Sequence, residues 1–283
     1  LEERMATSEE NVVAFLEDLY QKAYPAAQGE WQEMEHFAKQ NLGLNTLEKW
    51  DTAYVSEKLK KAQLKLDEQQ LKPYFPLERV KAGVFDIANK LYGLHFKKNS
   101  TLEGYHTDVE IFEVYNGEGD FYALLYTDFF PRTGKRSGAW MTSYRGQKKG
   151  QRPHISIVCN FSKPTASTPS LLTFQEVTTL FHEFGHALHG MLANTTYGGL
   201  SGTNVYWDFV ELPSQIMENW CYEKEALELF AKHYRSQELI PMEYIDKIKK
   251  AAHFQQGLQT LRQLGFGFLD LSYHDTQATN IKA

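Results

Sequence analysis

Two histidines four residues apart, His182 and His186, constrain the fold of this chain more than any other feature. Residues at this spacing project from the same face of a helix. Apolar side chains recur around them at helical intervals: Val177, Leu180, Phe181, Phe184, Leu188, Met191 and Leu192. Just upstream, Thr173 and Glu176 stand at the spacing of a capping box. The pattern therefore predicts a helix that begins near Thr173 and presents both imidazoles on one face.

Two imidazoles on one helical face can bind a single metal ion, and Glu183 stands directly after the first of them. The pattern His-Glu-x-x-His on a helix is typical of zinc peptidases. Zinc in such a site lowers the pKa of its water to about 7 and polarises the scissile carbonyl. Glu183 would take the proton of that water and pass it to the leaving amine. The alternative is a core helix whose histidines only hydrogen-bond to their neighbours.

A hydrolytic zinc site usually has three protein ligands, so a third ligand must lie elsewhere. His189 shares the helical face, but about 10 Å of helix rise separates it from His182, which is too far for one ion. The metzincin extension requires glycine and histidine at the positions that hold His189 and Leu192. That class is therefore excluded.

A glutamate from a second helix can complete the site. Residues 208–220 predict such a helix, because Ile216, Met217 and Trp220 lie at helical spacing after a glycine-rich connection. Asp208 could cap this helix, and Pro213 is tolerated only near its first turn. The spacing alone leaves three candidate ligands open, namely Glu211, Glu218 and Glu223.

Two blocks of the chain resemble the thimet oligopeptidase family of zinc metallopeptidases, namely residues 182–189 (HEFGHALH) and 208–220 (DFVELPSQIMENW). Residues 126–130 (YTDFF) and 200–203 (LSGT) are similar to its bacterial peptidyl-dipeptidase branch. The resemblance runs from about Leu77 to the end of the chain and is weaker before it. It implies a zincin-like catalytic helix and a zinc site built from two helices.

The resemblance also implies roles for individual residues. His182, His186 and Glu211 would bind one Zn²⁺ per chain, and Glu183 would be the general base. The implied reaction is hydrolysis of short oligopeptides, with release of dipeptides from the C-terminus. From spacing, Gln215 or Glu218 could orient a ligand histidine.

Two alternative functions stay open at this point. One is a zinc endopeptidase of an unrelated family, whose third ligand would not be Glu211. The other is a non-catalytic, zinc-containing peptide-binding or structural fragment. The family carries a glycine- and tyrosine-rich loop for the oxyanion, and no such segment precedes Ala283. Because the chain also begins at Leu1, we expect the central part of a longer enzyme.

The fold that we expect is mainly α with a small, largely antiparallel β-sheet. Helical spacing covers residues 12–24, 31–41, 47–66 and 77–94, and helices return after residue 173. Strand patterns cover residues 109–115, 121–129 and 154–160, and the last of these is a candidate to pair with a peptide substrate. We expect one catalytic domain over 1–283, with a helical lobe (1–98), a sheet region (99–170) and the zinc-binding helices (171–283).

Composition narrows the set of partners. The formal net charge is -6 and no basic stripe is present, which argues against nucleic acid as a partner. No apolar run approaches the roughly 20 residues that a membrane span needs, and no signal peptide is visible. We therefore expect a cytoplasmic monomer that acts on short peptides.

Overall fold

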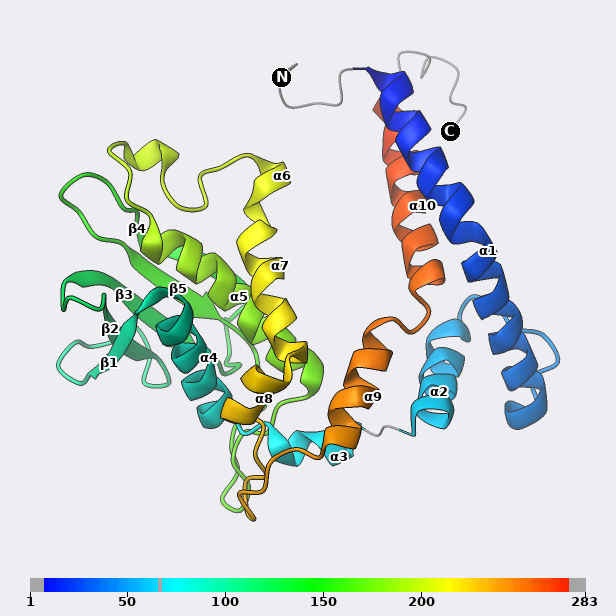
Figure 1. Cartoon of the computed structure of the whole chain (residues 1–283), viewed down its shortest axis with the longest axis horizontal. Coiled ribbons are helices and arrows are strands. Elements are labelled where there is room, and N and C mark those ends of the chain that lie inside the picture. The colour runs from blue at the N-terminus through cyan, green and yellow to red at the C-terminus, as the bar shows by residue number, and fades with distance from the viewer. Residues whose placement is uncertain (1–7, 66–67, 275–283) are drawn as a thin grey trace. The chain divides into compact units, whose positions relative to one another are not determined.

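The computed structural model describes residues 8–65 and 68–274 of the chain. This part is mostly helical and contains a five-stranded sheet, which confirms the expectation of a mainly α fold with a small sheet (Figure 1). Residue contacts divide the chain into two compact units, one of Leu1–Leu66 with Lys247–Ala283 and one of Asp67–Asp246. No helix in the described ranges is both long and apolar enough to cross a membrane.

The first unit is helical and brings together the first and the last of the described helices. It contains α1 (Glu9–Leu42), α2 (Thr52–Leu64) and α10 (Gln256–His274), and α9 (Met242–Ala252) spans the boundary between the units. Figure 1 shows α1 and α10 side by side. The Glu30 carboxylate accepts hydrogen bonds from the backbone N–H groups of Gly257 and Leu258, at 3.1 and 2.8 Å. Glu30 therefore caps the first turn of α10.

The expectation of two helices, 12–24 and 31–41, is wrong, because α1 continues through Pro25. Proline removes one backbone donor, so the carbonyl of Gln21 loses its helical partner. Gln21 and Pro25 are both exposed, and water can satisfy that carbonyl. Packing against α10 then keeps this stretch helical, since Gly257 lies directly against the backbone of Ala27.

The second unit contains the sheet and the helices around it. Its helices are α3 (Glu68–Leu71), α4 (Leu77–Tyr92), α5 (Phe174–Leu192), α6 (Trp207–Val210), α7 (Leu212–Asn219) and α8 (Lys224–Phe230). Its strands are β1 (His95–Asn99), β2 (Glu110–Tyr115), β3 (Phe121–Asp128), β4 (Trp140–Arg145) and β5 (His154–Val158). Short 3₁₀ turns occupy Lys72–Tyr74, Gly198–Leu200 and Trp220–Tyr222.

The strands run in the order β1-β2-β3-β5-β4. β3 and β5 are parallel, and the other neighbouring pairs are antiparallel, so the sheet is mixed. The predicted strands at 109–115, 121–129 and 154–160 appear as β2, β3 and β5. The sequence missed β1 and β4, which are the two edge strands. Edge strands are less buried and carry more polar residues, so their alternation is weak.

The helix α5 lies against β3, β4 and β5 of this sheet. Arg152 ties its C-terminal end to the sheet, because its guanidinium donates to the carbonyls of Met191 and Ala193 on one side and of Tyr122 on the other. The distances are 2.6, 3.0 and 2.7 Å, respectively. A cation at a helix C-terminus also interacts favourably with the helix dipole. The face of α5 that carries His182 and His186 is thereby fixed relative to β4.

Candidate metal centre

The helix α5 begins as its sequence predicts. The Thr173 hydroxyl accepts from the backbone N–H of Glu176 at 3.1 Å, and the Glu176 carboxylate accepts from the backbone N–H of Thr173 at 2.7 Å. This reciprocal capping box satisfies two backbone donors that the first turn leaves unpaired. Downstream, the ring centroids of His182 and His186 lie 4.9 Å apart on one face.

Gly185, between the two histidines, lets a second helix approach α5 closely. A Cβ atom at this position would lie 2.5 Å from the Pro213 carbonyl oxygen and 2.5 Å from the Ser214 Cα. Only a residue without a side chain permits this contact between α5 and α7. The contact places Glu211, the residue immediately before α7, beside the two histidines.

The expectation that Asp208 caps this helix is wrong. Asp208 lies inside the short helix α6, and Glu211 occupies the N-cap position of α7. The side chain of Glu211 makes no capping hydrogen bond. Its carboxylate instead accepts from the Ser214 hydroxyl at 2.7 Å and is directed toward α5. Ser214 therefore holds the glutamate in place.

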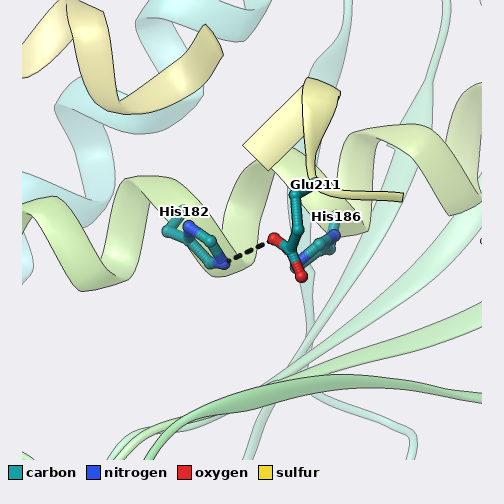
Figure 2. A group of neighbouring side chains, drawn as sticks. All are labelled: His182, His186 and Glu211. Atoms are coloured by element: carbon teal, nitrogen blue, oxygen red, sulfur yellow. Dashed lines mark ion pairs between the residues drawn. The ribbon is translucent and has the colours of Figure 1, made fainter. Parts of the chain in front are cut away.

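One carboxylate oxygen of Glu211 lies between the histidines (Figure 2). It is 3.2 Å from His182 Nε2 and 3.1 Å from His186 Nε2. One donor atom from each of the three residues lies within 4.8 Å of the other two. Two atoms bound to one tetrahedral zinc at about 2.0–2.1 Å lie about 3.4 Å apart, so this donor set fits such an ion. It is the one group of this kind among residues 8–65 and 68–274.

The other candidate ligands lie outside this cluster. Glu218 contacts the opposite ring nitrogen of His182, with Oε1 at 2.6 Å from Nδ1. Glu223 stands at the N-cap position of α8. The ring of His189 packs against the ring of Phe209, with centroids 6.1 Å apart.

Charges and burial shift the pKa values of the clustered residues in different directions. The hydrogen bond to Glu218 raises the pKa of His182, and the nearby carboxylates add to this effect. Burial lowers the pKa of His186. Burial would raise the pKa of Glu211, but the Ser214 hydrogen bond and the two histidines outweigh it and lower that pKa. The carboxylate is thus kept ionised, in the form that binds a cation.

Glu183 is buried, with 7% of its surface exposed. Burial raises the pKa of its carboxyl group, although the charge of His182 and the nearby backbone of Met141 oppose the rise. Met141 belongs to the edge strand β4. The strand β4 and the helix α5 therefore lie close together at the Glu183 carboxylate.

A cavity of about 370 Å³ opens over the cluster and is lined by His182, His186, Glu183 and Glu211, and by Trp140 and Met141 of β4. Residues 154–160 were one candidate for a substrate-pairing strand, with a plain core strand as the alternative, and β5 is the core strand, because it is hydrogen-bonded to β3 and to β4. An added peptide strand needs an unpaired edge. The edge strands are β1 and β4, and β4 is the one that lines the cavity.

Asn160, which follows β5, and Lys135, in the loop before β4, fix the start of β4. The Asn160 amide donates to the carbonyls of Arg136 and Gly138, at 3.0 and 2.7 Å. The Lys135 ammonium, whose side chain is 3% exposed, binds the Asp128 carboxylate at 2.9 Å and the Phe130 carbonyl at 2.8 Å. These bonds hold the loop between β3 and β4 and set where the edge strand begins.

Sequence reasoning missed Gly185 and Met141. A glycine in a helix interior costs about 1 kcal/mol relative to alanine, so Gly185 did carry a signal of close packing. Met141 carried none, because the sheet, and not a local sequence pattern, places it beside Glu183 in the lining of the cavity.

Comparison with known proteins gives the chain its family. The model of Peptidase family M3 matches residues 1–282, so the match extends through the N-terminal part where the sequence resemblance is weak. The chain is 41% identical over 277 residues to oligopeptidase A of Escherichia coli (strain K12), covering 96% of this chain and 41% of that protein.

Two further relatives carry other names. Dipeptidyl carboxypeptidase of the same bacterium is 38% identical over 275 residues, covering 96% of this chain and 40% of that protein. Mitochondrial intermediate peptidase of Yarrowia lipolytica is 32% identical over 306 residues, covering 97% of this chain and 39% of that protein. The chain thus spans about two fifths of the length of these relatives. The family match over nearly the whole chain confirms the resemblance seen in the sequence, and the chain belongs to Peptidase family M3.

Proposed function

We propose that this chain carries the zinc centre of a peptidase that hydrolyses short oligopeptides and releases dipeptides from their C-terminus. The observation that carries the proposal is the position of one Glu211 oxygen, 3.2 and 3.1 Å from the Nε2 atoms of His182 and His186. Two relatives, named oligopeptidase A and dipeptidyl carboxypeptidase, support the peptide as substrate and the C-terminal mode.

In this proposal α5 is a zincin-like catalytic helix, and α5 and α7 together form a two-helix zinc site. His182, His186 and Glu211 hold one Zn²⁺. Imidazole nitrogen and carboxylate oxygen are both common zinc ligands, and three protein ligands are typical of catalytic rather than structural zinc. When bound there, zinc supplies a Lewis acid and lowers the pKa of water to about 7.

The chain's own residues then perform the proton transfers. Glu183 accepts a proton from the attacking water as general base and donates it to the leaving amine as general acid. Its raised pKa suits both roles, because a carboxyl group that titrates nearer to neutrality both takes up and releases a proton readily. Glu218 orients His182 by accepting its Nδ1 hydrogen, which leaves the Nε2 lone pair for the metal.

The edge of β4 orients the peptide. Main-chain groups of an extended substrate can pair with this strand, which supplies hydrogen bonds that do not depend on the substrate's sequence. The strand begins at Trp140, beside the ligand cluster, so pairing would bring a peptide bond to the cavity over Glu183. This explains how one site can process peptides of varied sequence.

Other expectations stay predictions. We infer that residues 1–283 form the central part of one catalytic domain, with the regions 1–98, 99–170 and 171–283. A cytoplasmic location, a monomeric state and the lack of nucleic-acid partners belong to the same proposal.

Zinc analysis of the purified chain tests the metal centre. We expect one zinc per chain after reconstitution, lost in Glu211→Ala because the carboxylate ligand is removed. Glu225→Ala removes an exposed glutamate of α8 and should leave the zinc content unchanged. Full zinc in Glu211→Ala would exclude this residue as a ligand.

Glu183→Gln tests the reaction. The variant should keep one zinc and lose hydrolysis of an internally quenched peptide in the full-length protein, because it removes the base and leaves the ligands. Turnover at the wild-type rate would contradict the role of Glu183. Zinc binding by the wild-type protein without any turnover would favour a non-catalytic peptide-binding function.

A further inference from the structure

A second cavity, of about 280 Å³, lies next to the metal centre along β4. It shares Met141 and Thr203 with the cavity over the ligand cluster, so the two are neighbours. The polar side chains around it are those of Thr142, Ser143, Gln147, Ser201, Thr203 and Asn204. None of the described residues that line it is charged. We call it the polar cavity.

Gln147 builds one wall of the polar cavity. It is buried, with 3% of its surface exposed. Its Nε2 donates to the Thr195 carbonyl at 2.9 Å, and its Oε1 accepts from the Thr195 backbone N–H at 2.9 Å and from the Ser201 hydroxyl at 2.6 Å. These bonds fasten the connection that follows α5 onto the turn that follows β4. The wall is therefore a built part of the fold.

The edge strand forms the opposite wall. The ladder between β4 and β5 shifts register between Ser143 and Arg145, and such irregularities re-aim side chains beside binding sites. The Arg145 guanidinium is engaged by the Arg152 carbonyl, at 3.2 and 3.0 Å from two of its nitrogens. Arg145 is not among the residues that line the polar cavity.

The strand β4 also sets the distance between the polar cavity and the metal centre. A peptide paired with β4 advances about 3.3 Å per residue. Ser143 follows Met141 by two residues, and Met141 and Glu183 both line the cavity over the His182, His186 and Glu211 cluster. A peptide residue beside Ser143 is therefore about two or three positions from the bond that is cleaved.

We infer that the polar cavity is a subsite for a neutral, hydrogen-bonding side chain of the peptide, about two or three residues from the scissile bond. Hydroxyl and amide groups of Ser143, Thr203 and Asn204 can hydrogen-bond to serine, threonine, asparagine or glutamine. A charged side chain would lose hydration there without meeting an opposite charge, so it is disfavoured. The inference rests on the proposed function and adds a substrate preference to it.

Peptide hydroxamates test the subsite in the zinc-loaded chain. The hydroxamate group binds zinc and fixes the register, and two series place it at the carboxyl or the amino end of the peptide. Each peptide carries glutamine, lysine or glutamate at one position in turn, and titration calorimetry gives the Kd. At one position, about two or three residues from the hydroxamate, we expect glutamine to bind about tenfold more tightly than lysine or glutamate.

Charge placed at Ser143 should change this preference. Ser143→Asp should strengthen binding of the lysine peptide about fivefold at that position alone, and Ser143→Lys should do the same for the glutamate peptide. Ser143 is exposed on an edge strand, so both variants should fold. Ser167→Asp adds the same charge on the exposed loop that precedes α5 and should change neither preference.

The outcomes separate the subsite from the metal centre. Hydroxamates that bind without any position-dependent preference, or a Ser167→Asp effect equal to that of Ser143→Asp, would overturn the subsite and leave the metal centre supported. Hydroxamates that do not bind the zinc-loaded chain would overturn both the subsite and the proposed function.

Discussion

His182 and Glu218 are joined across α5 and α7, with the histidine Nδ1 2.6 Å from the carboxylate Oε1. A carboxylate accepts a hydrogen, so this contact holds a proton on Nδ1, and in the neutral imidazole it leaves the Nε2 lone pair, on the side of Glu211, available to a cation. The same contact joins α5 to α7. One pair thus orients the imidazole and adds a bond between the two helices.

Glu218→Ala should weaken zinc binding about 10–100-fold, because His182 loses the partner that fixes its tautomer and orientation. The measurement is a competition titration against a chromophoric chelator. Gln215→Ala is the matched control, since Gln215 is an exposed residue of the same helix and was the other candidate for this role in the sequence. Equal losses of affinity in both variants would show that a general effect on α7, and not the hydrogen bond, is responsible.

Gly185→Ala should both destabilise the protein and weaken zinc binding. The added methyl group would meet backbone atoms of Pro213 and Ser214 at 2.5 Å, and backbone cannot move aside as a flexible side chain can. We expect a loss of about 1–3 kcal/mol in the free energy of unfolding, measured with urea. Because α7 must shift, Glu211 would move away from the histidines.

A second alanine variant separates the two effects. Gly199→Ala places a methyl group where no atom lies within 4 Å, and its backbone has no positive φ. It should leave both stability and zinc affinity near the wild-type values. If Gly185→Ala behaved in the same way, the close approach of α5 and α7 would not be what positions Glu211.

The parts of the fold that the sequence predicts are those with strong local signals. The helix α5 has a capping box and an apolar stripe within one segment, and both appear as predicted. β2, β3 and β5 lie inside the sheet and have apolar runs. β1 and β4 are edge strands, and what makes them strands is pairing with distant residues. The continuous α1 likewise depends on α10, more than 200 positions along the chain.

The residues of the candidate site likewise fall into those that a local sequence pattern predicts and those that depend on tertiary packing. His182, Glu183 and His186 are close in sequence, and a single helix brings them together. Spacing could not choose among the glutamates of the following segment, because the choice depends on how closely α7 approaches α5. Only the family resemblance selected Glu211, and the structure places it beside both histidines. The contact of Met141 with Glu183 depends on the sheet and has no local signal.

Thr173→Ala should lower the free energy of unfolding by about 1 kcal/mol, because it removes the hydroxyl that accepts from the Glu176 N–H group. Thr173→Ser keeps that hydroxyl and is the control. Urea unfolding followed by circular dichroism measures both variants. Equal stability of the alanine and serine variants would show that the capping box does not stabilise α5.

Asp128 should make stability depend on pH. Its buried carboxylate is held by Arg132 and Lys135, at 2.8 and 2.9 Å, and by the hydroxyl of Tyr105 at 2.9 Å. Burial alone would raise its pKa, but these partners outweigh burial and lower it. A carboxyl group whose pKa is lower in the folded state stabilises the protein above the unfolded pKa of about 3.9, and this stabilisation is lost as the pH falls through the folded value.

Asp128→Asn should therefore cost about 3–5 kcal/mol in the free energy of unfolding near pH 7, because Lys135 is left buried without its counter-charge. Urea unfolding of both proteins over a series of pH values measures the difference between them. The difference should begin to narrow below about pH 4, where Asp128 of the unfolded chain takes up a proton, and should continue to narrow as the pH falls toward the lower folded-state pKa. Asp86→Asn changes an exposed aspartate of α4 and should show neither the cost nor the narrowing. A difference that stays constant down to low pH would mean that the ionised Asp128 is not what secures the loop leading to β4.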